Sequence, residues 1–472
     1  MRTSTLFAST TALLALMAFK QDAAHTSLPA AYPVRSSAMG KGVRAIKGTQ
    51  DVVAVVAAAN AFLATLSTTQ QTTAVVAYNA TNVVKWSNLP CGAQCREGLE
   101  FANLTTAQIT AALAVVQAAT GTVANDGFDE TQQIRAADDN LSAASSSGGG
   151  GGGGGGYGSG LYFIAFVGTP SATGTWMLQY GGHHLATNIT FGAGAVTGAT
   201  PKFEGVEPLT FTGTGNTTTV VPAGTFTPMG NEAATMVALL GGLTTAHKAT
   251  AKLTQTFSDV LLGPGQDGKF PTTKVGVKCS DLTAAEQALV IAAMKPWVQD
   301  ADDATAANLM TTYQAQLADT YISYAGTGLF TTNTDYARID GPNVWIEFVA
   351  QTGVVYNTQT HFHSIWRDHA RDYGGNFYGS FTTTLGTKAA AAVQVFSVYP
   401  NPTEAHTLNI RLASTATAAT CTLRNTLGQQ VASQQFSGDG TTLSTAGLAA
   451  GAYILSVQTA GQNPVTQRVI LK

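Results

Sequence analysis

Nine consecutive glycines, Gly148–Gly156, directly follow the three serines Ser145–Ser147. Glycine loses more conformational freedom on folding than any other residue, so the few contacts of such a run cannot order it. The tract therefore predicts a flexible loop or linker over residues 145–160. A phosphate-binding loop is excluded, because no Lys-Ser or Lys-Thr follows the glycines and the next element is a predicted strand.

The composition is typical of an exported protein with more than one domain. A chain of 472 residues is longer than a single core usually grows. Hydrophobic residues make up 44 % and charged residues only 11 %. Charged residues are thus scarcer than in an average soluble domain, and Ala, Thr and Gly take their place. The formal net charge is -3 and no run of Lys and Arg occurs, which excludes the electrostatic signature of a nucleic-acid-binding protein.

The N-terminus has the parts of a secretory signal peptide. Arg2 precedes the apolar stretch Leu6–Phe19, and the small residues Ala23-Ala24 follow it. We predict a signal peptide over residues 1–24 and an exposed lead-in over residues 25–50. Beyond this segment no apolar run of about 18 residues occurs, so the mature chain is not expected to span a bilayer.

The centre of the chain, residues 51–387, is predicted to be an α+β body of mixed helices and strands. Apolar residues at three- and four-residue spacing predict helices, and alternating apolar residues bounded by Gly and Pro predict strands. The first two strands are expected to form a hairpin-like pair. The predicted helices are 51–66, one that follows Thr105, 232–262 and 282–324, and the predicted strands are 161–167, 176–180, 343–349 and 358–366.

The last part of the chain, residues 393–472, predicts a small all-β immunoglobulin-like sandwich. Short apolar strands alternate there with Gly, Asn and Ser turns at near-regular spacing. The boundary to the body is expected within residues 389–393, a small-residue stretch without an amphipathic pattern. The predicted strands are 407–412, 419–424, 430–436 and 452–458.

Several short motifs follow one another in this tail. They are Phe396-Ser397-Val398-Tyr399-Pro400-Asn401-Pro402, Leu427-Gly428-Gln429, Gly451-Ala452-Tyr453-Ile454-Leu455 and Arg468-Val469-Ile470-Leu471-Lys472. In this order they resemble the C-terminal sorting domain of the type IX secretion system. The resemblance implies a Bacteroidetes-type bacterium, the type IX secretion machinery as a partner, and a protein that is secreted or kept at the outer-membrane surface.

Three segments of the body carry a second resemblance. They are Trp86-Ser87-Asn88-Leu89-Pro90, Trp176-Met177-Leu178-Gln179-Tyr180-Gly181-Gly182-His183-His184, and Asp340-Gly341-Pro342-Asn343-Val344-Trp345 with His361-Phe362-His363-Ser364-Ile365-Trp366-Arg367-Asp368. The body resembles the family known as domain of unknown function 3500. Because this family has no established activity, the resemblance implies a shared framework and no mechanism. The polyglycine tract and the cysteine pair at positions 91 and 95 depart from the family pattern.

Cys91 and Cys95 lie four residues apart in Pro90-Cys91-Gly92-Ala93-Gln94-Cys95. Outside the cytosol such a pair can close a small disulfide loop, and the alternative is two free thiols. Metal binding by this pair would need two further ligands, and the other two cysteines, Cys279 and Cys421, offer no second paired motif.

Four of the eight histidines form two tight groups, His183-His184 and His361-Phe362-His363. Side chains alternate along a strand, so His361 and His363 are expected on one face, where both could coordinate the same metal ion. Neutral imidazole is a common ligand of zinc and also suits copper. If the two groups meet in the fold, His183, His184, His361 and His363 predict a transition-metal site, of zinc or copper, with an open position.

Charged residues near these histidines are the predicted catalytic groups. Arg367 is expected to orient an anionic or carbonyl group and to pair with Glu347, and Asp368 is a further candidate. A ligating imidazole usually donates its other N–H to a carboxylate or carbonyl. The candidates for that outer role are Glu204, Glu347, Asp368 and Asp372, with His369 as a reserve ligand.

The resulting functional prediction is a secreted metal-dependent hydrolase or oxidase that acts on an unknown small molecule. The alternative is a non-catalytic surface protein, in which the same histidines bind a ligand or hold strands together. The sequence lacks a Gly-x-Ser-x-Gly elbow near an apolar strand and a His-Glu-x-x-His motif, so serine-hydrolase and zinc-protease signatures are absent.

Overall fold

The computed structural model describes residues 52–146, 156–376, 396–404, 406–425, 429–459 and 465–472. The chain divides between Thr383 and Thr384 into two compact units, the body and the tail. The predicted signal peptide and lead-in, residues 147–155 of the polyglycine loop, and the predicted boundary at residues 389–393 lie outside the described residues.

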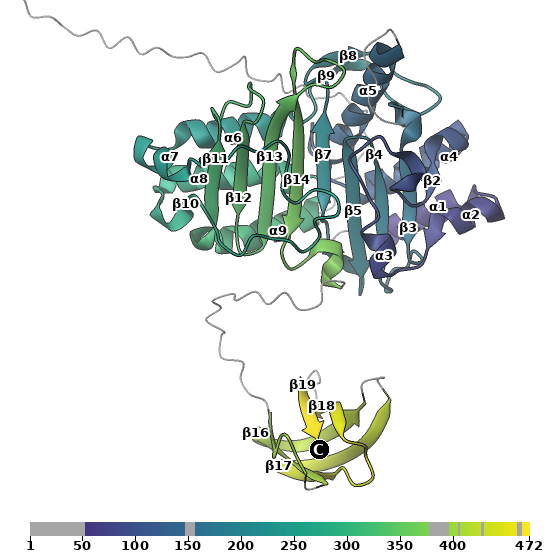
Figure 1. Ribbon diagram of the computed structural model, residues 1–472. Coiled ribbons are helices and arrows are strands. Elements are labelled where there is room, and N and C mark those ends of the chain that lie inside the picture. The colour runs from purple at the N-terminus through teal and green to yellow at the C-terminus, as the bar shows by residue number, and fades with distance from the viewer. Residues whose placement is uncertain (1–51, 147–155, 377–395, 405, 426–428, 460–464) are drawn as a thin grey trace, which may run out of the picture. The chain divides into compact units, whose positions relative to one another are not determined.

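One twelve-stranded sheet runs through the described part of the body (Figure 1). Neighbouring strands are antiparallel except for the first pair, β1 and β3. In sheet order the strands are β1 (Val75–Val76), β3 (Phe163–Val167), β4 (Trp176–Gly182), β5 (Leu185–Gly192), β7 (Lys202–Val206), β14 (Thr360–Asp368), β13 (Val344–Thr352), β12 (Tyr336–Asp340), β11 (Tyr321–Ala325) and β10 (Val277–Lys278), with β2 (Leu99–Glu100) beside β3 and β6 (Ala195–Gly198) beside β5. A separate small hairpin pairs β8 (Phe211–Gly213) with β9 (Gly224–Phe226).

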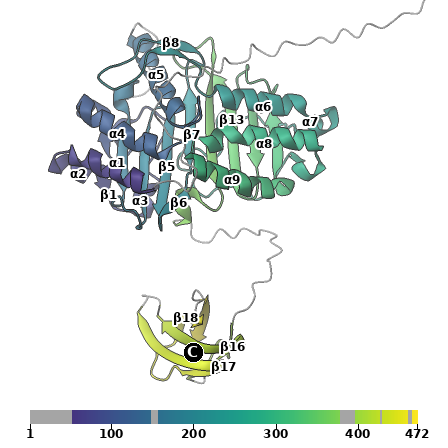
Figure 2. The same cartoon turned by 180° about the vertical axis from the view of Figure 1, so that it is seen from behind.

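Helices cover one face of this sheet, as Figure 2 shows. They are α1 (Val52–Ala64), α4 (Thr106–Ala119), α5 (Gly127–Ser146), α6 (Gly230–Gly242), α8 (Ala284–Gln299) and α9 (Asp303–Ala315), with the shorter α2 (Thr68–Ala74) and α7 (Thr245–Ala251) at the ends of this layer. The other face packs against α3 (Ala80–Val83), the chain that follows it, and the irregular segment 252–276. We call these the helix face and the loop face.

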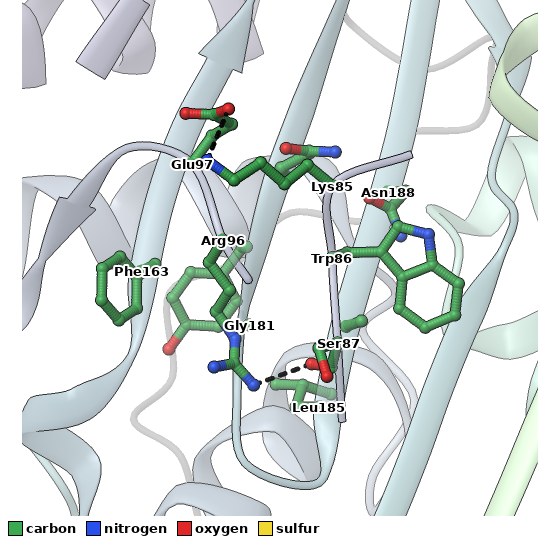
Figure 3. Close-up of a pocket in the computed structure, with 12 residues that line it drawn as sticks. Lys85, Trp86, Ser87, Arg96, Glu97, Phe163, Gly181, Leu185 and Asn188 are labelled. Carbon is green, nitrogen blue, oxygen red and sulfur yellow. Dashed lines mark hydrogen bonds and ion pairs between the residues drawn. The ribbon is translucent and has the colours of Figure 1, made fainter. Parts of the chain in front are cut away.

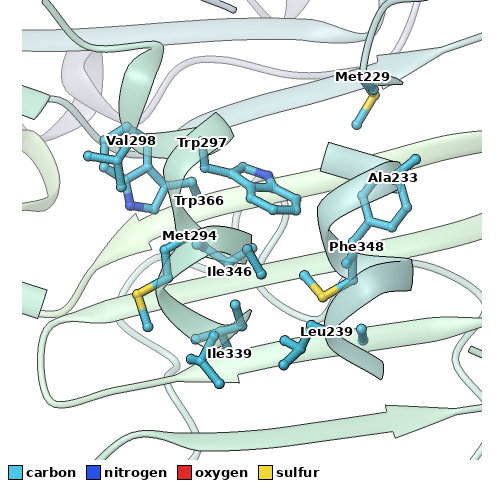
Figure 4. Packing of buried hydrophobic residues seen from close by; sticks show 14 of the residues in the cluster. Met229, Ala233, Leu239, Met294, Trp297, Val298, Ile339, Ile346, Phe348 and Trp366 are labelled. Atoms are coloured by element: carbon cyan, nitrogen blue, oxygen red, sulfur yellow. The ribbon is translucent and has the colours of Figure 1, made fainter. Parts of the chain in front are cut away.

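Apolar side chains fill both faces, so the central strands are buried on both sides. On the helix face, Trp297 of α8 lies in one apolar cluster with Phe348 and Trp366 of the sheet (Figure 4). On the loop face, Trp86, Phe203 and Ile365 belong to a second cluster. Burying apolar area stabilises a fold by about 25 cal/mol per Å², and this arrangement buries it on two sides of each strand.

Several predicted elements are confirmed. The helix predicted over 51–66 is α1, and the helix predicted after Thr105 is α4, whose first turn Thr105 caps through its side chain. The two strands predicted as a hairpin-like pair are β3 and β4, which pair antiparallel.

Two long helix predictions are wrong. The segment 232–262 contains α6 and α7 and then crosses to the loop face without regular structure, because Gly241-Gly242 ends α6. The segment 282–324 contains α8, α9 and strand β11, and Asp302 breaks it by capping α9. In both segments an apolar pattern that fits one helix is divided by local capping and turn residues.

Thr283 and Glu286 form a capping box at the start of α8. The Glu286 carboxylate accepts hydrogen bonds from Thr283 N (2.8 Å) and Thr244 N (2.7 Å), and His247 Nδ1 lies 2.9 Å from it. Burial acts to raise the pKa of Glu286, but these hydrogen bonds outweigh it and hold the pKa at about 2. The box therefore joins α8 to the turn before α7.

We expect Glu286→Gln to lower the free energy of unfolding at pH 7 by about 1 to 2 kcal/mol, because the amide keeps only one acceptor oxygen and carries no charge. The folded pKa lies below its ordinary value of 4.5, so the carboxylate stabilises the native state above that pH and loses this effect as the pH falls towards about 2. The stability difference between wild type and variant should therefore shrink on acidification. All five tryptophans lie in the body, so urea unfolding followed by tryptophan fluorescence measures this unit alone. An unchanged midpoint at pH 7 would contradict the assignment.

The tail is all-β, as predicted. Its described strands form one curled antiparallel sheet around a single apolar core, with the long strand β16 shared between its two halves. The strands predicted at 407–412 and 419–424 are the two ends of β16. The strands are β15 (Phe396–Tyr399), β16 (Thr407–Arg424), β17 (Gln430–Ser444), β18 (Gly451–Thr459) and β19 (Val465–Leu471).

Candidate metal centre

The fold brings the two histidine groups together at one end of the sheet. His183 and His184 form the turn between β4 and β5, and His361 and His363 stand near the start of β14. Strand β7 lies between β5 and β14 and pairs with both. The His184 ring centroid lies 3.7 Å from that of His183, 5.6 Å from that of His361 and 5.1 Å from that of His363.

Gly205 of β7 makes this approach possible. It is the strand partner of His363, and its N–H donates to the carbonyl oxygen of His184 at 2.7 Å. A Cβ atom at this position would lie only 3.0 Å from Cδ2 of both His184 and His363, and 2.9 Å from the carbonyl oxygen of Phe362. The two rings therefore meet across a strand position that has room for glycine alone.

Three of the histidines have the spacing of metal ligands. One ring nitrogen each from His184, His361 and His363 lies within 4.8 Å of the other two, and all three residues are buried. Ligand nitrogens bound to one zinc ion at about 2.0 to 2.1 Å are about 3.4 Å apart in tetrahedral geometry. Shortening these separations by at most about 1.4 Å would thus be enough for one ion to bind all three nitrogens.

The backbone of His184 is held in an uncommon conformation. Its φ is 61°, in the left-handed region that non-glycine residues rarely adopt. Its N–H donates to the carbonyl oxygen of Asn88 at 3.0 Å, and its carbonyl accepts from Gly205. The neighbouring carbonyl of His183 accepts from the Tyr162 hydroxyl at 3.0 Å. These bonds fix the turn, so His184 points towards β14 at the cost of local strain.

Two carboxylates orient the histidines from opposite faces of the sheet. Asp138 of α5 lies 2.7 Å from Nδ1 of His183, and Asp259 of the loop-face segment lies 3.0 Å from Nδ1 of His363. By contrast, Nδ1 of His361 is buried and has no hydrogen-bond partner among the described residues. Carboxylates in this position fix the ring tautomer of a ligating histidine and raise its basicity.

The electrostatics of the centre favour neutral imidazoles at His184 and His361. Burial lowers the pKa of His361 to about 3, and burial together with the three neighbouring histidines lowers the pKa of His184 well below its ordinary value. Burial raises the pKa of Asp138, although the charge of His183 and its hydrogen bond oppose this. Burial would also raise the pKa of Asp259, but the hydrogen bond and charge of His363 hold it lower.

His183 is the member of the cluster that reaches a hollow in the surface. The hollow has a volume of about 140 Å³ and is also lined by Arg96, Glu100 and the disulfide loop. The ring of Tyr157 lies 4.8 Å from that of His183. A small molecule could therefore approach the centre from the His183 side.

Cys91 and Cys95 form a disulfide, which was one of the two alternatives left open by the sequence. Arg96, next to this loop, donates to the carbonyl oxygens of Ser87 (2.8 Å), Leu89 (2.7 Å) and Gly182 (2.6 Å). Figure 3 shows its side chain directed at the end of β4, beside a cavity of about 20 Å³, which is room for one water molecule. Arg96 thus ties the disulfide loop to the residue that precedes His183.

The three predicted catalytic residues make their hydrogen bonds outside the histidine cluster. Arg367 is four residues from His363 along β14, a distance of about 13 Å. The predicted pair of Arg367 with Glu347 is wrong: Arg367 pairs with Asp372 (2.9 Å) and Asp267 (3.1 Å) and donates to carbonyls of the loop-face segment. Asp368 accepts hydrogen bonds from the Tyr313 hydroxyl and from N–H groups of the turn that follows β14.

Glu347 has four hydrogen bonds of its own. Its fully buried carboxylate accepts from the N–H groups of Leu261 (2.7 Å) and Leu262 (2.9 Å), the Tyr336 hydroxyl (2.7 Å) and Trp345 Nε1 (2.8 Å). Burial raises the pKa of Glu347, and these hydrogen bonds act against it. Its contacts serve to hold the irregular segment 252–276 on the loop face.

The predicted outer carboxylates are not the ones that contact the histidines. Glu204 points to the helix face and pairs with Lys202, and Asp372 pairs with Arg367. His369 stacks on Phe270, with ring centroids 3.9 Å apart, outside the cluster. Sequence reasoning missed Asp138 because helix α5 was not predicted, and it missed Asp259 because that residue lay inside a predicted helix.

Comparisons with known proteins confirm both resemblances. Residues 48–375 match the family described as "Protein of unknown function (DUF3500)", and residues 397–472 match the "Secretion system C-terminal sorting domain". The second match is to the sorting domain of type IX secretion, which indicates a secreted or cell-surface protein. A search of curated proteins found no match. Among the helices within the described ranges, none is long and apolar enough to cross a membrane.

Proposed function

We propose that this chain, which belongs to the DUF3500 family and is exported through its type IX sorting domain, binds a transition metal ion at His184, His361 and His363 and uses it for hydrolysis. The observation that carries the proposal is the convergence of three buried imidazoles whose ring nitrogens lie within 4.8 Å of one another. Three histidine ligands leave one position of a tetrahedral ion open for water or substrate.

The hydrogen bonds around the imidazole rings indicate which ring nitrogens would coordinate the metal. His363 gives Nδ1 to Asp259, which leaves Nε2 for the metal. His361 has a buried Nδ1 without a partner in the described chain, an arrangement that is costly unless a ligand occupies it. A bound zinc ion would lower the pKa of a coordinated water towards neutrality and so supply a nucleophile.

His183 and Asp138 support hydrolysis over oxidation. Asp138 fixes Nδ1 of His183, so the other ring nitrogen would be the one to accept a proton from water at the centre. His183 also lines the hollow, where a substrate would enter. In this proposal His183 acts beside the metal as a proton acceptor, and Asp138 is its positioning residue.

The first test is elemental analysis of the protein purified without chelator, and again after reconstitution with zinc or copper. We expect one equivalent of transition metal per chain, and its loss in the double variant His361→Ala, His363→Ala. The matched control His247→Ala removes an imidazole that lies outside the cluster and should keep the metal. Absence of metal from the reconstituted wild type would refute the proposal.

A second variant separates metal binding from catalysis. His183→Gln should keep the metal but lose hydrolysis of an activated ester such as p-nitrophenyl acetate. If His183→Gln loses the metal as well, His183 is a fourth ligand and not the proton acceptor. If the metal is bound but no activated ester or phosphate ester is hydrolysed, the site has a structural or binding role, and the hydrolytic part of the proposal fails.

A further inference from the structure

A second group of potential ligands lies on the helix face of the sheet, one residue along β7 from Gly205. It consists of Glu130 of α5, Glu204 of β7 and Glu232 of α6, none more than 2 % exposed. One carboxylate oxygen from each lies within 4.8 Å of the other two. Three elements that are far apart in the sequence thus direct acidic side chains at one buried point.

The compartment around this point is strongly acidic. Asp126 and Asp300 also face it and interact electrostatically with Glu204. Lys202 is the cation paired with the group, at 2.6 Å from Glu204 and 2.7 Å from Asp300. Five carboxylates against one ammonium leave an excess of four negative charges if all are ionised, and burying uncompensated charge is very costly.

Several carboxylate oxygens around this point have no hydrogen-bond partner among the residues that the structure describes. Neither carboxylate oxygen of the fully buried Glu232 has a hydrogen-bond partner on another residue in the described ranges. Glu130 accepts from Met229 N (2.8 Å) through Oε1, but its Oε2 has no partner there, and the same holds for Oδ2 of Asp126. Buried polar atoms are almost always satisfied, so these oxygens point to a missing positively charged partner.

We propose that Glu130, Glu204 and Glu232 form a binding site for a hard divalent cation of the calcium type. Calcium takes oxygen ligands at about 2.3 to 2.6 Å, which places adjacent ligand oxygens about 3.3 to 3.7 Å apart and opposite ones about 4.6 to 5.2 Å apart in octahedral geometry. The three carboxylate oxygens lie within 4.8 Å of one another, so a small inward shift would bring them to such distances. Asp126 and Asp300 supply further negative charge nearby.

This site goes beyond the proposed histidine centre and differs from it in chemistry. An all-carboxylate set selects calcium, magnesium or manganese, whereas imidazoles select zinc and copper. The two sites share β7 but use its opposite faces, since Glu204 points to the helix face and Gly205 to the loop face. Their metals can therefore be removed independently.

The role of the cation would be structural. It would cross-link α5 and α6 to the centre of the sheet and neutralise carboxylates that otherwise repel one another. A secreted protein meets calcium outside the cell, where sites with modest affinity are filled. The body should therefore be more stable with calcium than without it.

The test is refolding of the full chain from urea, with calcium, with magnesium or with chelator alone. After gel filtration, elemental analysis should find one calcium per chain, and tryptophan fluorescence should report a higher melting temperature than in chelator. Glu232→Gln should weaken calcium binding by about 100-fold or more, since it removes one charged ligand. Glu97→Gln, a surface carboxylate paired with Lys85, is the matched control and should bind calcium normally.

If the refolded wild type retains neither calcium nor magnesium, the proposal is overturned, because protons and not a cation then neutralise the carboxylates. Calcium retained equally by Glu232→Gln overturns the assignment to this cluster. If that variant does not fold, Asp126→Asn takes its place and should also weaken binding. The double variant His361→Ala, His363→Ala should lose the transition metal but keep calcium, which separates failure of this site from failure of the histidine centre.

Discussion

Replacing Glu347 by alanine is expected to lower the free energy of unfolding of the body by about 3 to 5 kcal/mol. The substitution removes the acceptor of four hydrogen bonds in a position that is fully buried. Each buried donor that loses its acceptor costs about 1 to 3 kcal/mol, although relaxation and water entry reduce the sum. Two of the donors are backbone N–H groups of the segment 252–276, so its attachment to the loop face should weaken as well.

Urea unfolding followed by tryptophan fluorescence measures this effect, with Glu97→Ala as the control. Glu97 forms a partly exposed ion pair with Lys85 at 3.0 Å, which is worth at most about 1 kcal/mol. The comparison also tests the role that the sequence predicted for Glu347. A catalytic carboxylate would tolerate replacement without loss of stability, so a variant as stable as wild type would contradict the structural role.

Gly205→Ala is expected to weaken transition-metal binding at the histidine centre by about 10- to 100-fold, the range seen when the supporting shell of a metal site is disturbed. The new Cβ atom would lie 3.0 Å from the rings of His184 and His363 and 2.9 Å from a backbone oxygen. The rings would have to move apart, while no ligand is removed. Competition of the variant and wild type with a chelator of known zinc affinity measures the change.

Gly192→Ala is the matched control, because Gly192 lies at the far end of β5 and a Cβ atom there would meet only threonine side-chain atoms, at 3.3 Å or more. It should leave zinc affinity unchanged. Equal affinities for Gly205→Ala and wild type would mean that the rings do not converge over β7 to hold one ion.

Local sequence patterns predicted correctly those helices and strands that are set by capping residues and short turns. Thr105 and its capping box start α4, and the alternation around the Gly-Thr-Pro turn gives the β3–β4 pair. Sequence patterns gave wrong predictions where a segment is held by residues that are distant in the sequence. Residues 232–262 have the apolar content of a helix, but their last part, from residue 252, crosses the loop face and is held by Glu347, which lies 86 residues beyond Leu261 along the chain.

The sequence by itself determined which side chains offer metal-binding chemistry, since the two histidine groups stand out as paired imidazoles and one pair alternates on a strand. It also determined export, through the motifs of the tail. Only the tertiary structure decided that β7 separates the two groups by one glycine, that Asp138 and Asp259 are their carboxylate partners, and that Glu347, Arg367 and Asp368 have hydrogen bonds elsewhere. The physical reason is that residue type and spacing are local properties, whereas strand order and the burial of each charge depend on contacts between distant segments.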